Sequence, residues 1–542
     1  MIESMSTLID IKELSSKSSE FKPGSTILLK DGTYSGLSIK ITSKGSDGKR
    51  IYIKPQNPGK VILTGSSRIL MESSHVTLAN LVLKDGGSSK PAAHIKGNNN
   101  RITGFDVSYS ESSTDQMFRI EGKYNRIDHN IFHDWDKNGV WVVVWRPNKE
   151  EDYALIDHNI FKNRISNGED NGLECVRIGT STDSLTNSKS LVYANQFINC
   201  NGEIEVISNK AGENIYYKNY MENSEGTLTL RHGNSCIVYK NHIDQKNKEE
   251  SGGIRITGEK HIVANNLFKN INGNGTTRVG ISINNGVKDS ELNEYFQVKN
   301  TQIKNNIFIN CSNDFAVGVK VKSESELKPI DSEISGTISF NPDNDDERFS
   351  DNSKVLGSDD MKYINNIFYA KEIGKVPKTE GIKLINPSEF DLPSFEQKIS
   401  GIYKTETGGP DWTKQPEDTE IKISSVQYYN DLKNQILNEI SSHKSLLDES
   451  TTPDEDTTPD DEDTTPDDED TTPDDEDTTP DDDGNDDDDN NDEKITINKE
   501  EYDRLIKIEE YAKNIIPHLI SLQKSIFDVS PHIGTLQDAI NN

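Results

Sequence analysis

The chain lacks the features that mark disulfide-stabilised and membrane-spanning proteins. Its 542 residues include four cysteines, which form no C-x-x-C pair: Cys175, Cys200, Cys236 and Cys311. Cysteines so few and so scattered exclude a disulfide framework and favour buried free thiols. No stretch approaches the roughly 18 consecutive apolar residues of a membrane-spanning helix. The first residues also lack the basic and apolar segments of a secretory signal, so we expect neither a membrane span nor an export signal.

Lysine and arginine are absent from residues 454–493, which contain 24 of the acidic residues behind the net charge of −32. Residues 448–493 are too charged and too poor in apolar side chains to fold, so they are predicted to form a disordered acidic linker. The rest of the chain is only mildly acidic. Residues 1–447 are therefore predicted to form the main domain.

Residues 494–542, after the linker, regain the apolar spacing of a helix. The repeating positions include Tyr502, Leu505, Ile508 and Leu519. This spacing predicts a small C-terminal helical module. A module of about fifty residues rarely stabilises itself alone, so self-association or docking to a larger assembly is its expected role.

A short pattern, apolar-x-x-Asn-x-apolar, recurs through the first two thirds of the chain. Its central positions, 22–36 residues apart, are Asn80, Phe105, Asn130, Asn159, Asn195, Asn219, Asn241 and Asn266. Repeats of this length, built from short β-rich runs and polar turns, indicate stacked coils that share one core. Leucine-rich repeats have similar periods, but their L-x-x-L-x-L signature is missing. The pattern therefore predicts an all-β fold, a right-handed parallel β-helix, continuing to about residue 370.

Asparagine suits a repeated turn because it tolerates the left-handed backbone region. Stacked asparagine side chains can also hydrogen-bond from coil to coil. Near the N-terminus, Leu8, Ile11 and Leu14 have helical spacing, which predicts a short helical cap. A second helix is predicted over residues 428–447, where it would close the domain.

Charged residues gather in four neighbouring coils. These are NGLECVRIG (171–179), NGEIEVISNK (201–210), GTLTLRHG (226–233) and SGGIRITG (251–258). In a strand, the two-residue spacing of Glu203 and Glu205 puts both carboxylates on one face. Like charges side by side are unfavourable, so a cation is expected between them.

An oxygen-only cation site can form at this pair. Asn171 lies one coil and a loop earlier, so it can join Glu203 and Glu205 in a site of the kind that Ca²⁺ prefers. The residues that would flank it are Lys210, Arg231, His232 and Arg255. Taken one at a time, these residues could equally form a surface ion-pair ladder.

In this order and at these spacings, the four motifs resemble polysaccharide lyase family 6, which contains the alginate lyases and the chondroitin B lyases. The stretches PGSTILLKDGTYSG (23–36) and NPGKVILTG (57–65) resemble the opening coils of that family. The resemblance covers about residues 20–370. It implies a polysaccharide lyase that uses Ca²⁺ and cleaves a uronic acid polymer.

The resemblance also implies a role for individual residues. The Ca²⁺ ligands would be Asn171, Glu203 and Glu205. The catalytic residues would be Lys210, as the Brønsted base, and Arg231. His232 and Arg255 match substrate-binding positions. Apart from the resemblance, three further arginines could bind an anionic polymer: Arg146, Arg177 and Arg278.

Such a lyase removes the C5 proton of a uronic acid and expels the 4-linked sugar. Ca²⁺ neutralises the carboxylate beside C5 and stabilises the developing enolate. A lysine base must first lose its own proton, which nearby cations and partial burial favour. Arginine is a reluctant proton donor, so Arg231 is expected to stabilise charge while water or another group protonates the leaving oxygen.

The expected partner is an anionic polysaccharide, with alginate as the first candidate and dermatan sulfate as the second; a nucleic acid is not expected. A hydrolase would need two carboxylates flanking a glycosidic bond, and Glu203 and Glu205 are too close together for that. A non-catalytic β-helix protein that binds polysaccharide or lies on a virion surface is the remaining alternative. Uronic polymers lie outside most cells, so an extracellular or virion-associated location is expected.

Overall fold

The computed structural model describes residues 6–111, 114–168, 171–273, 275–342, 349–351, 361–375, 380–416 and 426–442. The chain divides into two compact units, Met1–Asp454 and Glu455–Asn542, and every described residue belongs to the first. The linker predicted over 448–493 and the helical module predicted over 494–542 lie outside the described residues. Both therefore stay predictions.

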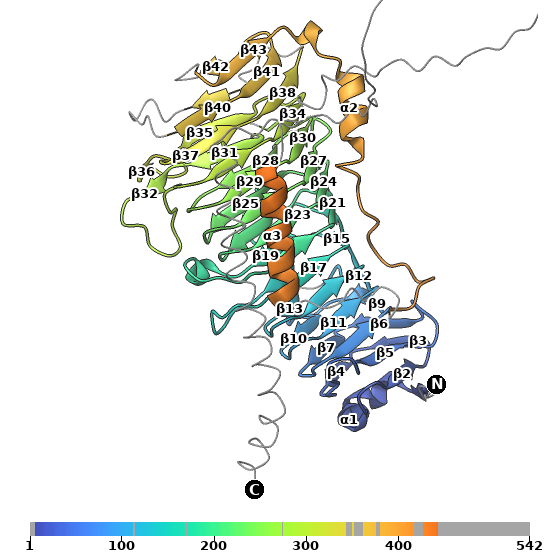
Figure 1. The fold of residues 1–542 in the computed structure, drawn as a ribbon. Helices are drawn as coiled ribbons and strands as arrows, with labels where there is room; N and C mark the ends of the chain where they lie inside the picture. The colour runs from blue at the N-terminus through green and yellow to red at the C-terminus, as the bar shows by residue number, and fades with distance from the viewer. Residues whose placement is uncertain are drawn as a thin grey trace, which may run out of the picture. The chain divides into compact units, whose positions relative to one another are not determined.

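Three long sheets, which we name A, B and C, run through this unit (Figure 1). Sheet A contains β1 (Ser6–Ile9), β2 (Thr26–Leu29), β5 (Ile51–Pro55), β8 (Val76–Ala79), β11 (Arg101–Thr103), β14 (Arg126–Asp128), β17 (Leu155–Asp157), β20 (Leu191–Tyr193), β23 (Ile215–Tyr217), β26 (Ile237–Tyr239), β29 (Ile262–Ala264), β33 (Gln302–Lys304), β37 (Ser332–Ser335) and β40 (Met361–Ile364). Sheet B contains β3 (Gly32–Ser35), β6 (Val61–Gly65), β9 (Val82–Gly86), β12 (Asp106–Ser108), β15 (Ile131–Trp135), β18 (Ile160–Arg164), β21 (Gln196–Cys200), β24 (Tyr220–Glu222), β27 (His242–Asp244), β30 (Leu267–Lys269), β34 (Ile307–Ile309), β38 (Ile338–Asn341), β41 (Asn366–Ala370) and β43 (Ile382–Ile385). Sheet C contains β4 (Ser38–Ile41), β7 (Arg68–Met71), β10 (Ala93–Ile95), β13 (Gln116–Ile120), β16 (Val140–Val144), β19 (Val176–Ile178), β22 (Glu205–Lys210), β25 (Gly226–His232), β28 (Ser251–Ile256), β31 (Ile281–Asn284), β35 (Phe315–Val319), β39 (Phe349–Asp351) and β42 (Gly374–Lys375).

Each coil contributes one strand to each of the three sheets. Neighbouring strands of a sheet come from consecutive coils and pair in parallel, as β16, β19 and β22 do. The predicted parallel β-helix is therefore confirmed.

The other elements lie outside this stack of coils. They are η1 (Ile11–Glu13), α1 (Leu14–Lys17), η2 (Ser18–Glu20), η3 (Ser181–Asp183), η5 (Pro387–Glu389), α2 (Leu392–Ser400), α3 (Val426–Ser442) and the antiparallel pair β32 (Gly286–Val287) and β36 (Ser325–Leu327). Within the described ranges, no helix is long and apolar enough to cross a membrane.

The N-terminal segment differs in part from the predicted helical cap. Leu8 lies in strand β1 and is 47% exposed, whereas Ile11 and Leu14 are buried in the short helices η1 and α1. Residues 6–9 pair with β2, so strand pairing removes Leu8 from the predicted helix.

The core lies inside the coils, where each inward side chain stacks on the equivalent residue of the next coil. The rings of Phe132, Phe161 and Phe197 stack in this way, with centroids 5.2 and 5.0 Å apart. This step matches the spacing of about 4.8 Å between neighbouring strands. All four cysteines are buried and free, as expected.

An asparagine ladder links the coils at the corner between sheets A and B. At each step, the side-chain oxygen of one asparagine accepts hydrogen bonds from the backbone N–H and the side-chain amide of the asparagine one coil earlier. For Asn159 and Asn195 both distances are 3.0 Å. The ladder contains Asn130, Asn159, Asn195, Asn219, Asn241, Asn266 and Asn306. The predicted coil-to-coil bonding is confirmed.

The ladder asparagines do not take the left-handed conformation, contrary to the prediction. That conformation belongs to the residue before each of them, such as His129 and His158, both with φ of 51°. In the earliest coil Asn80 itself has φ of 61°, and Leu81 holds the ladder position. The ladder position therefore requires asparagine for its amide, and the turn beside it tolerates several residue types.

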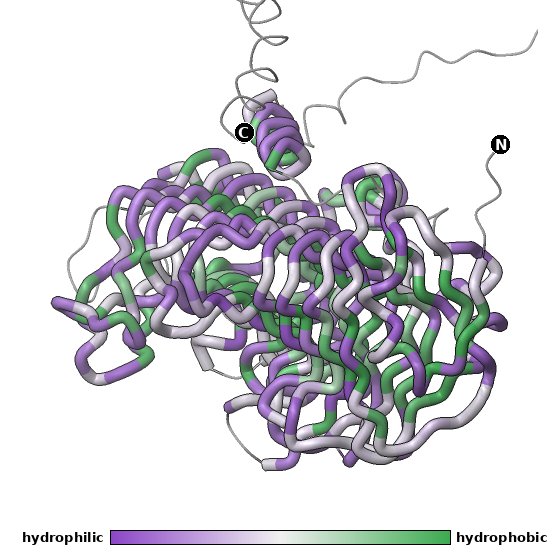
Figure 2. Tube along the Cα trace, turned by 90° about the horizontal axis from the view of Figure 1, so that it is seen from below, coloured by the Kyte–Doolittle hydropathy of each residue, from purple (hydrophilic) through white to green (hydrophobic). Residues whose placement is uncertain are grey.

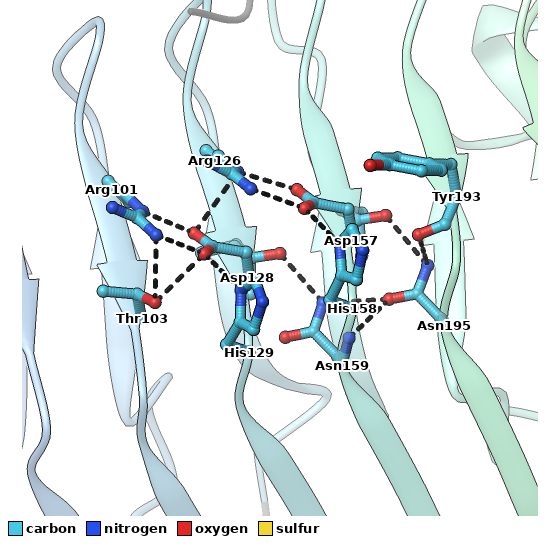
Figure 3. Close-up of polar contacts among 12 residues, drawn as sticks. Arg101, Thr103, Arg126, Asp128, His129, Asp157, His158, Asn159, Tyr193 and Asn195 are labelled. Carbon is cyan, nitrogen blue, oxygen red and sulfur yellow. Dashed lines mark hydrogen bonds and ion pairs between the residues drawn. The ribbon is translucent and has the colours of Figure 1, made fainter. Parts of the chain in front are cut away.

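A buried ion-pair ladder lies on the outer side of sheet A (Figure 3). Arg101 binds Asp128 through Nε and Nη2 at 2.7 and 2.6 Å, and Arg126 binds Asp157 in the same way at 2.8 and 2.6 Å. Burial alone would raise the pKa of Asp128, but Arg101 and Arg126 hold it well below its usual value. Each pair therefore stays ionised and ties neighbouring coils together.

After α2 the chain returns along the outside of the coils toward the N-terminal end (Figure 1). We name residues 403–416 the strap. The Tyr403 hydroxyl donates to the carbonyl of Asn265 at 2.9 Å, and the Trp412 indole donates to the carbonyl of Gly104 at 2.9 Å. Later strap residues thus bind earlier coils.

Helix α3 lies against the outer face of sheet A and not at an end of the stack (Figures 1 and 2). Its Tyr429 and Ile436 are buried among apolar residues of that face. The Glu439 carboxylate accepts from the Tyr239 hydroxyl and the Lys240 ammonium at 2.7 Å each. The helix predicted over 428–447 is present in its described part, where it covers the side of the domain.

Replacing Asn195 with alanine should destabilise the domain, because Asn159 would lose the acceptor for two buried N–H groups. An unsatisfied buried donor costs about 1–3 kcal/mol, so the free energy of unfolding should fall by about 2–4 kcal/mol. Urea unfolding followed by circular dichroism measures the change, with the exposed Asn167→Ala as the matched control. Equal stability of the two variants would contradict the role of the ladder.

Candidate active site

The predicted site residues lie on or beside sheet C. Strands β19, β22, β25 and β28 come from consecutive coils, so their equivalent positions form rows across the strands. One polar row contains, in strand order, Arg177, Ser208, Thr229 and Arg255. Its neighbours along each strand, such as Ile178, belong to the core. The register therefore turns this row outward.

Glu203 lies just before β22 and is bound by the preceding coil. Its Oε1 accepts hydrogen bonds from the backbone N–H groups of Gly172 and Leu173 at 2.8 and 2.9 Å. Asn171 is exposed and immediately precedes these two residues. The structure thus brings the coil of Asn171 onto Glu203, as the one-coil spacing predicts.

Glu205 is the first residue of β22. The register with β25 shifts between Glu205 and Ile207, so the strand is irregular at the predicted carboxylate pair. The Ser208 hydroxyl donates to Glu205 Oε2 at 2.5 Å, and Arg255 Nη2 donates to Oε1 at 3.4 Å. This carboxylate therefore has partners from its own strand and from β28.

Glu174, which the sequence analysis did not single out, lies between the predicted base, Lys210, and Arg177 of the polar row. It is buried, and neither of its carboxylate oxygens has a hydrogen-bond partner. Its Oε1 lies 3.8 Å from Lys210 Nζ and 3.5 Å from Arg177 Nη1. A buried carboxylate is costly unless cations compensate it. The sequence did carry a sign of this residue, because Glu174 is the acidic residue of the motif NGLECVRIG.

Arg231 is held by a loop that the repeat does not predict. Its Nη1 donates to the carbonyl of Glu294 at 2.8 Å and its Nη2 to the carbonyl of Asn293 at 3.1 Å. The guanidinium carbon lies 3.8 Å from the centroid of the Tyr295 ring. Burial lowers the pKa of Arg231, and Tyr295 opposes that shift. Because this loop interrupts the repeat, no sequence pattern pointed to Tyr295.

His232 and Arg255 are both buried near these cations. Neither ring nitrogen of His232 has a hydrogen-bond partner, and Arg255 Nε has none either. Burial, with Arg231, Lys210 and Arg255 nearby, lowers the pKa of His232 to about 2. His232 is therefore a neutral imidazole with unused hydrogen-bonding capacity.

Arg146 does not join this group. Its side chain is fully buried. Its Nε donates to Asp152 at 2.6 Å, and its Nη2 donates to the carbonyls of Glu150 and Asn187 at 2.7 and 2.6 Å. This geometry does not fit the predicted substrate-binding role, because the guanidinium is used to fix the loop after β16.

The residues predicted to bind Ca²⁺ fit a hard cation. Burial, together with the negative charges of Glu174 and Glu205, raises the pKa of Glu203 to about 8, although the backbone N–H groups of Leu173 and Gly172 oppose the shift. Carboxylate oxygens of this kind, together with the amide oxygen that Asn171 offers, are the ligand types that Ca²⁺ prefers. A cation would relieve the repulsion that produces this shift.

A second group of possible metal ligands lies on sheet A (Figure 3). Of the described His, Cys, Asp and Glu side chains, His129, Asp157 and His158 are the three whose ligand atoms lie within 4.8 Å of one another. Both Asp157 oxygens accept from Arg126, and each histidine Nδ1 lies 2.8 Å from an aspartate, Asp128 or Asp157. These atoms already serve the ion-pair ladder, so the group is better described as part of that ladder.

Comparison with solved structures supports the fold. A structure of the PL6 family alginate lyase AlyGC is 30% identical, with a TM-score of 0.65, and the match covers 70% of this chain and 53% of that one. This chain thus spans about half the length of AlyGC. A mannuronic acid specific polysaccharide family 6 lyase from human gut microbiota shares the fold at 24% identity and a TM-score of 0.66, covering 80% of this chain and 99% of that one.

The sequence comparisons give the family. No protein among the curated sequences matches the chain. The sequence model of the chondroitinase B family matches residues 8–390, well over half of the chain. This protein therefore belongs to polysaccharide lyase family 6, the chondroitinase B family.

Proposed function

We propose that this lyase cleaves alginate by a Ca²⁺-assisted β-elimination, with Lys210 as the base and Arg231 as the second catalytic residue. The observation that carries the proposal is the convergence of Lys210, Glu174 and Arg177 beside the crowded carboxylates of Glu203 and Glu205. Such a site can hold a polymer carboxylate and place an amine next to it. The 30% identical AlyGC, described as an alginate lyase, supports alginate as the substrate.

The cation site would consist of Asn171, Glu203 and Glu205. When bound there, Ca²⁺ would neutralise the uronate carboxylate beside C5 and so make the C5 proton easier to remove. Arg177 and Arg255 lie in the polar row of sheet C and would bind the same anionic residue of the polymer.

Lys210 performs the proton transfer in this proposal. Its Nζ takes the C5 proton, the C5 electron pair forms the C4–C5 double bond, and the bond from C4 to the glycosidic oxygen breaks. The amine becomes an ammonium in that step. The Glu174 carboxylate, 3.8 Å away, stabilises the new positive charge and fixes the position of Nζ.

Arg231 stabilises the negative charge that develops during the elimination. Two carbonyls and the Tyr295 ring fix its guanidinium, so no reorganisation is needed when that charge appears. Water or a neighbouring acid then protonates the departing oxygen. Neutral His232, with both ring nitrogens unpartnered, supplies a hydrogen bond to a substrate hydroxyl.

Dermatan sulfate is the second candidate substrate, because the matching family model is that of chondroitinase B. Incubation of the protein with alginate and with dermatan sulfate in separate samples distinguishes the two. Elimination leaves an unsaturated uronate that absorbs in the ultraviolet, whereas hydrolysis leaves none. Product from dermatan sulfate alone would replace alginate as the substrate, and no product from either polymer would favour a non-catalytic binding protein.

Lys210→Ala should abolish turnover while polymer binding is retained, because only the proton transfer needs the amine. We expect kcat to fall by at least about a hundredfold. Initial rates on alginate and calorimetric binding of the same polymer measure the two effects. Lys162→Ala, on an exposed position of sheet B, is the matched control. A K210A enzyme that keeps a tenth of wild-type kcat would rule out Lys210 as the base.

Removal of the cation should stop catalysis and leave the fold intact, because the coil stack buries the core without help from the site. A chelator should reduce activity to background, and added Ca²⁺ should restore it. Glu203→Gln should weaken Ca²⁺ binding about ten- to hundredfold in calorimetry, whereas Glu396→Gln on α2 should not change it. Full activity in excess chelator, with no metal found by elemental analysis, would refute the Ca²⁺ assignment.

Glu174→Gln keeps the shape of this side chain and removes its charge. Because Glu174 fixes the position of Lys210 Nζ, we expect kcat to fall about ten- to hundredfold with KM nearly unchanged. Glu174→Asp should restore part of the rate, and Glu222→Gln on sheet B serves as the control. An unchanged kcat in E174Q would show that the carboxylate only balances charge in the folded protein.

A further inference from the structure

An aromatic side chain lies on sheet C, on the N-terminal side of the proposed active site. Trp145 directly follows β16 and is partly exposed. Its backbone N–H donates to the carbonyl of Ile120 at 2.7 Å. The guanidinium carbon of Arg119, on β13, lies 4.4 Å from the centroid of the indole ring. One face of the indole is therefore backed by a cation.

Other charged residues hold this arginine in place. Arg119 Nη2 lies 2.6 Å from Glu121 Oε1, and His94 Nε2 lies 3.0 Å from the same oxygen. The side chain of Arg119 keeps 25% of its surface exposed, so some of its N–H groups can reach a ligand. The pair of Arg119 and Trp145 is thus fixed and accessible.

The strand register relates Trp145 to the proposed base. Val144 pairs with Ile178, and Ile178 pairs with Asn209. The next residues along these strands are Trp145, Gly179 and Lys210, which therefore form a row. Neighbouring strands are about 4.8 Å apart, so Trp145 lies about 10 Å from Lys210 across the sheet. That span is longer than a single sugar ring.

Gly179, which has no side chain, lies between the indole and the base in this row. A carboxylate close to Gly179, that of Asp183, accepts hydrogen bonds from the backbone and hydroxyl of Thr180. These two hydrogen bonds from Thr180 partly compensate the negative charge of Asp183.

Arg146 anchors the chain that follows Trp145. The buried guanidinium next in sequence to Trp145 binds Asp152 and the backbone of the loop after β16. The chain leaving Trp145 is therefore rigid, and an aromatic group held in advance binds a sugar with little loss of conformational freedom.

An outward row of sheet C that includes three arginines gives the direction of the proposed polymer. The row contains, in strand order, His94, Arg119, Val143, Arg177, Ser208, Thr229 and Arg255. It crosses the strands and therefore follows the axis of the β-helix. A polyanion that binds Arg177 and Arg255 and extends along this row would pass over Gly179 and reach Trp145.

We infer that Trp145 and Arg119 form a distal subsite for a uronate residue of the same polymer, beyond the sugar next to the cleaved bond. The inference rests on the proposed function, since it places the cleaved bond at Lys210. The indole stacks on the C–H face of the sugar ring, and Arg119 binds its carboxylate. Longer chains therefore bind more tightly than short ones, because only they reach this subsite.

Trp145→Leu tests the subsite. We expect KM for the polymer and for long oligomers to rise about five- to tenfold, with kcat within twofold, since stacking of one aromatic ring contributes about that much. Oligomers too short to span from Lys210 to Trp145 should show the wild-type KM. Trp145→Phe, which keeps a ring, should stay within about twofold of the wild type. Trp412→Leu, on the strap, is the matched control.

Binding measured without turnover separates this inference from the proposed function. In the Lys210→Ala background, Trp145→Leu should weaken calorimetric binding of a long uronate oligomer by the same factor, and thermal melting checks that the variant is folded. Equal binding with and without the indole, or an equal loss for short and long oligomers, would overturn the subsite. If the wild-type enzyme gives no unsaturated product, the proposed function fails, whereas a length-dependent loss of binding would still support the subsite.

Discussion

The fixed step from one coil to the next is the constraint on which the rest of the structure depends. The asparagine ladder holds it, since each amide bonds the coil before and the coil after. Parallel pairing then turns residues from distant parts of the chain, such as Arg177 and Arg255, into one row. A slip of one residue would turn that row into the core, so the geometry of the site follows from the register.

The sequence predicted the parts that repeat and missed those that do not. Spacing by coils placed Glu203, Lys210 and Arg231 in neighbouring coils, because residues at equivalent positions must stack, and the family resemblance supplied their expected roles. It could not locate Tyr295, because a loop between coils has no period. Nor could it distinguish an arginine in the polar row of sheet C from one, like Arg146, whose donors are used within the chain. The two kinds of arginine look alike in a sequence, and only their hydrogen-bond partners in the structure distinguish them.

Burial shifts the pKa values of the acidic and basic groups of the site in opposite directions. It raises the pKa of Glu203 to about 8 and lowers that of His232 to about 2, so both groups favour their neutral forms. The same surroundings leave Glu174 without hydrogen-bond partners. Such a site is unfavourable by itself, and a ligand that supplied the missing partners would stabilise it.

The helices of the C-terminal part of the described chain pack on the outer faces of sheets A and B. Helix α3 packs on apolar residues outside sheet A, and Phe395 and Ile399 of α2 pack on those outside sheet B. The central outward row of sheet C, by contrast, is largely polar and cationic, from His94 to Arg255. Apolar cover is stable on the first two faces and would leave charges unpaired on the third. The distribution of side chains around each coil thus confines the apolar cover to sheets A and B and leaves Arg119 and Arg177 of sheet C partly exposed.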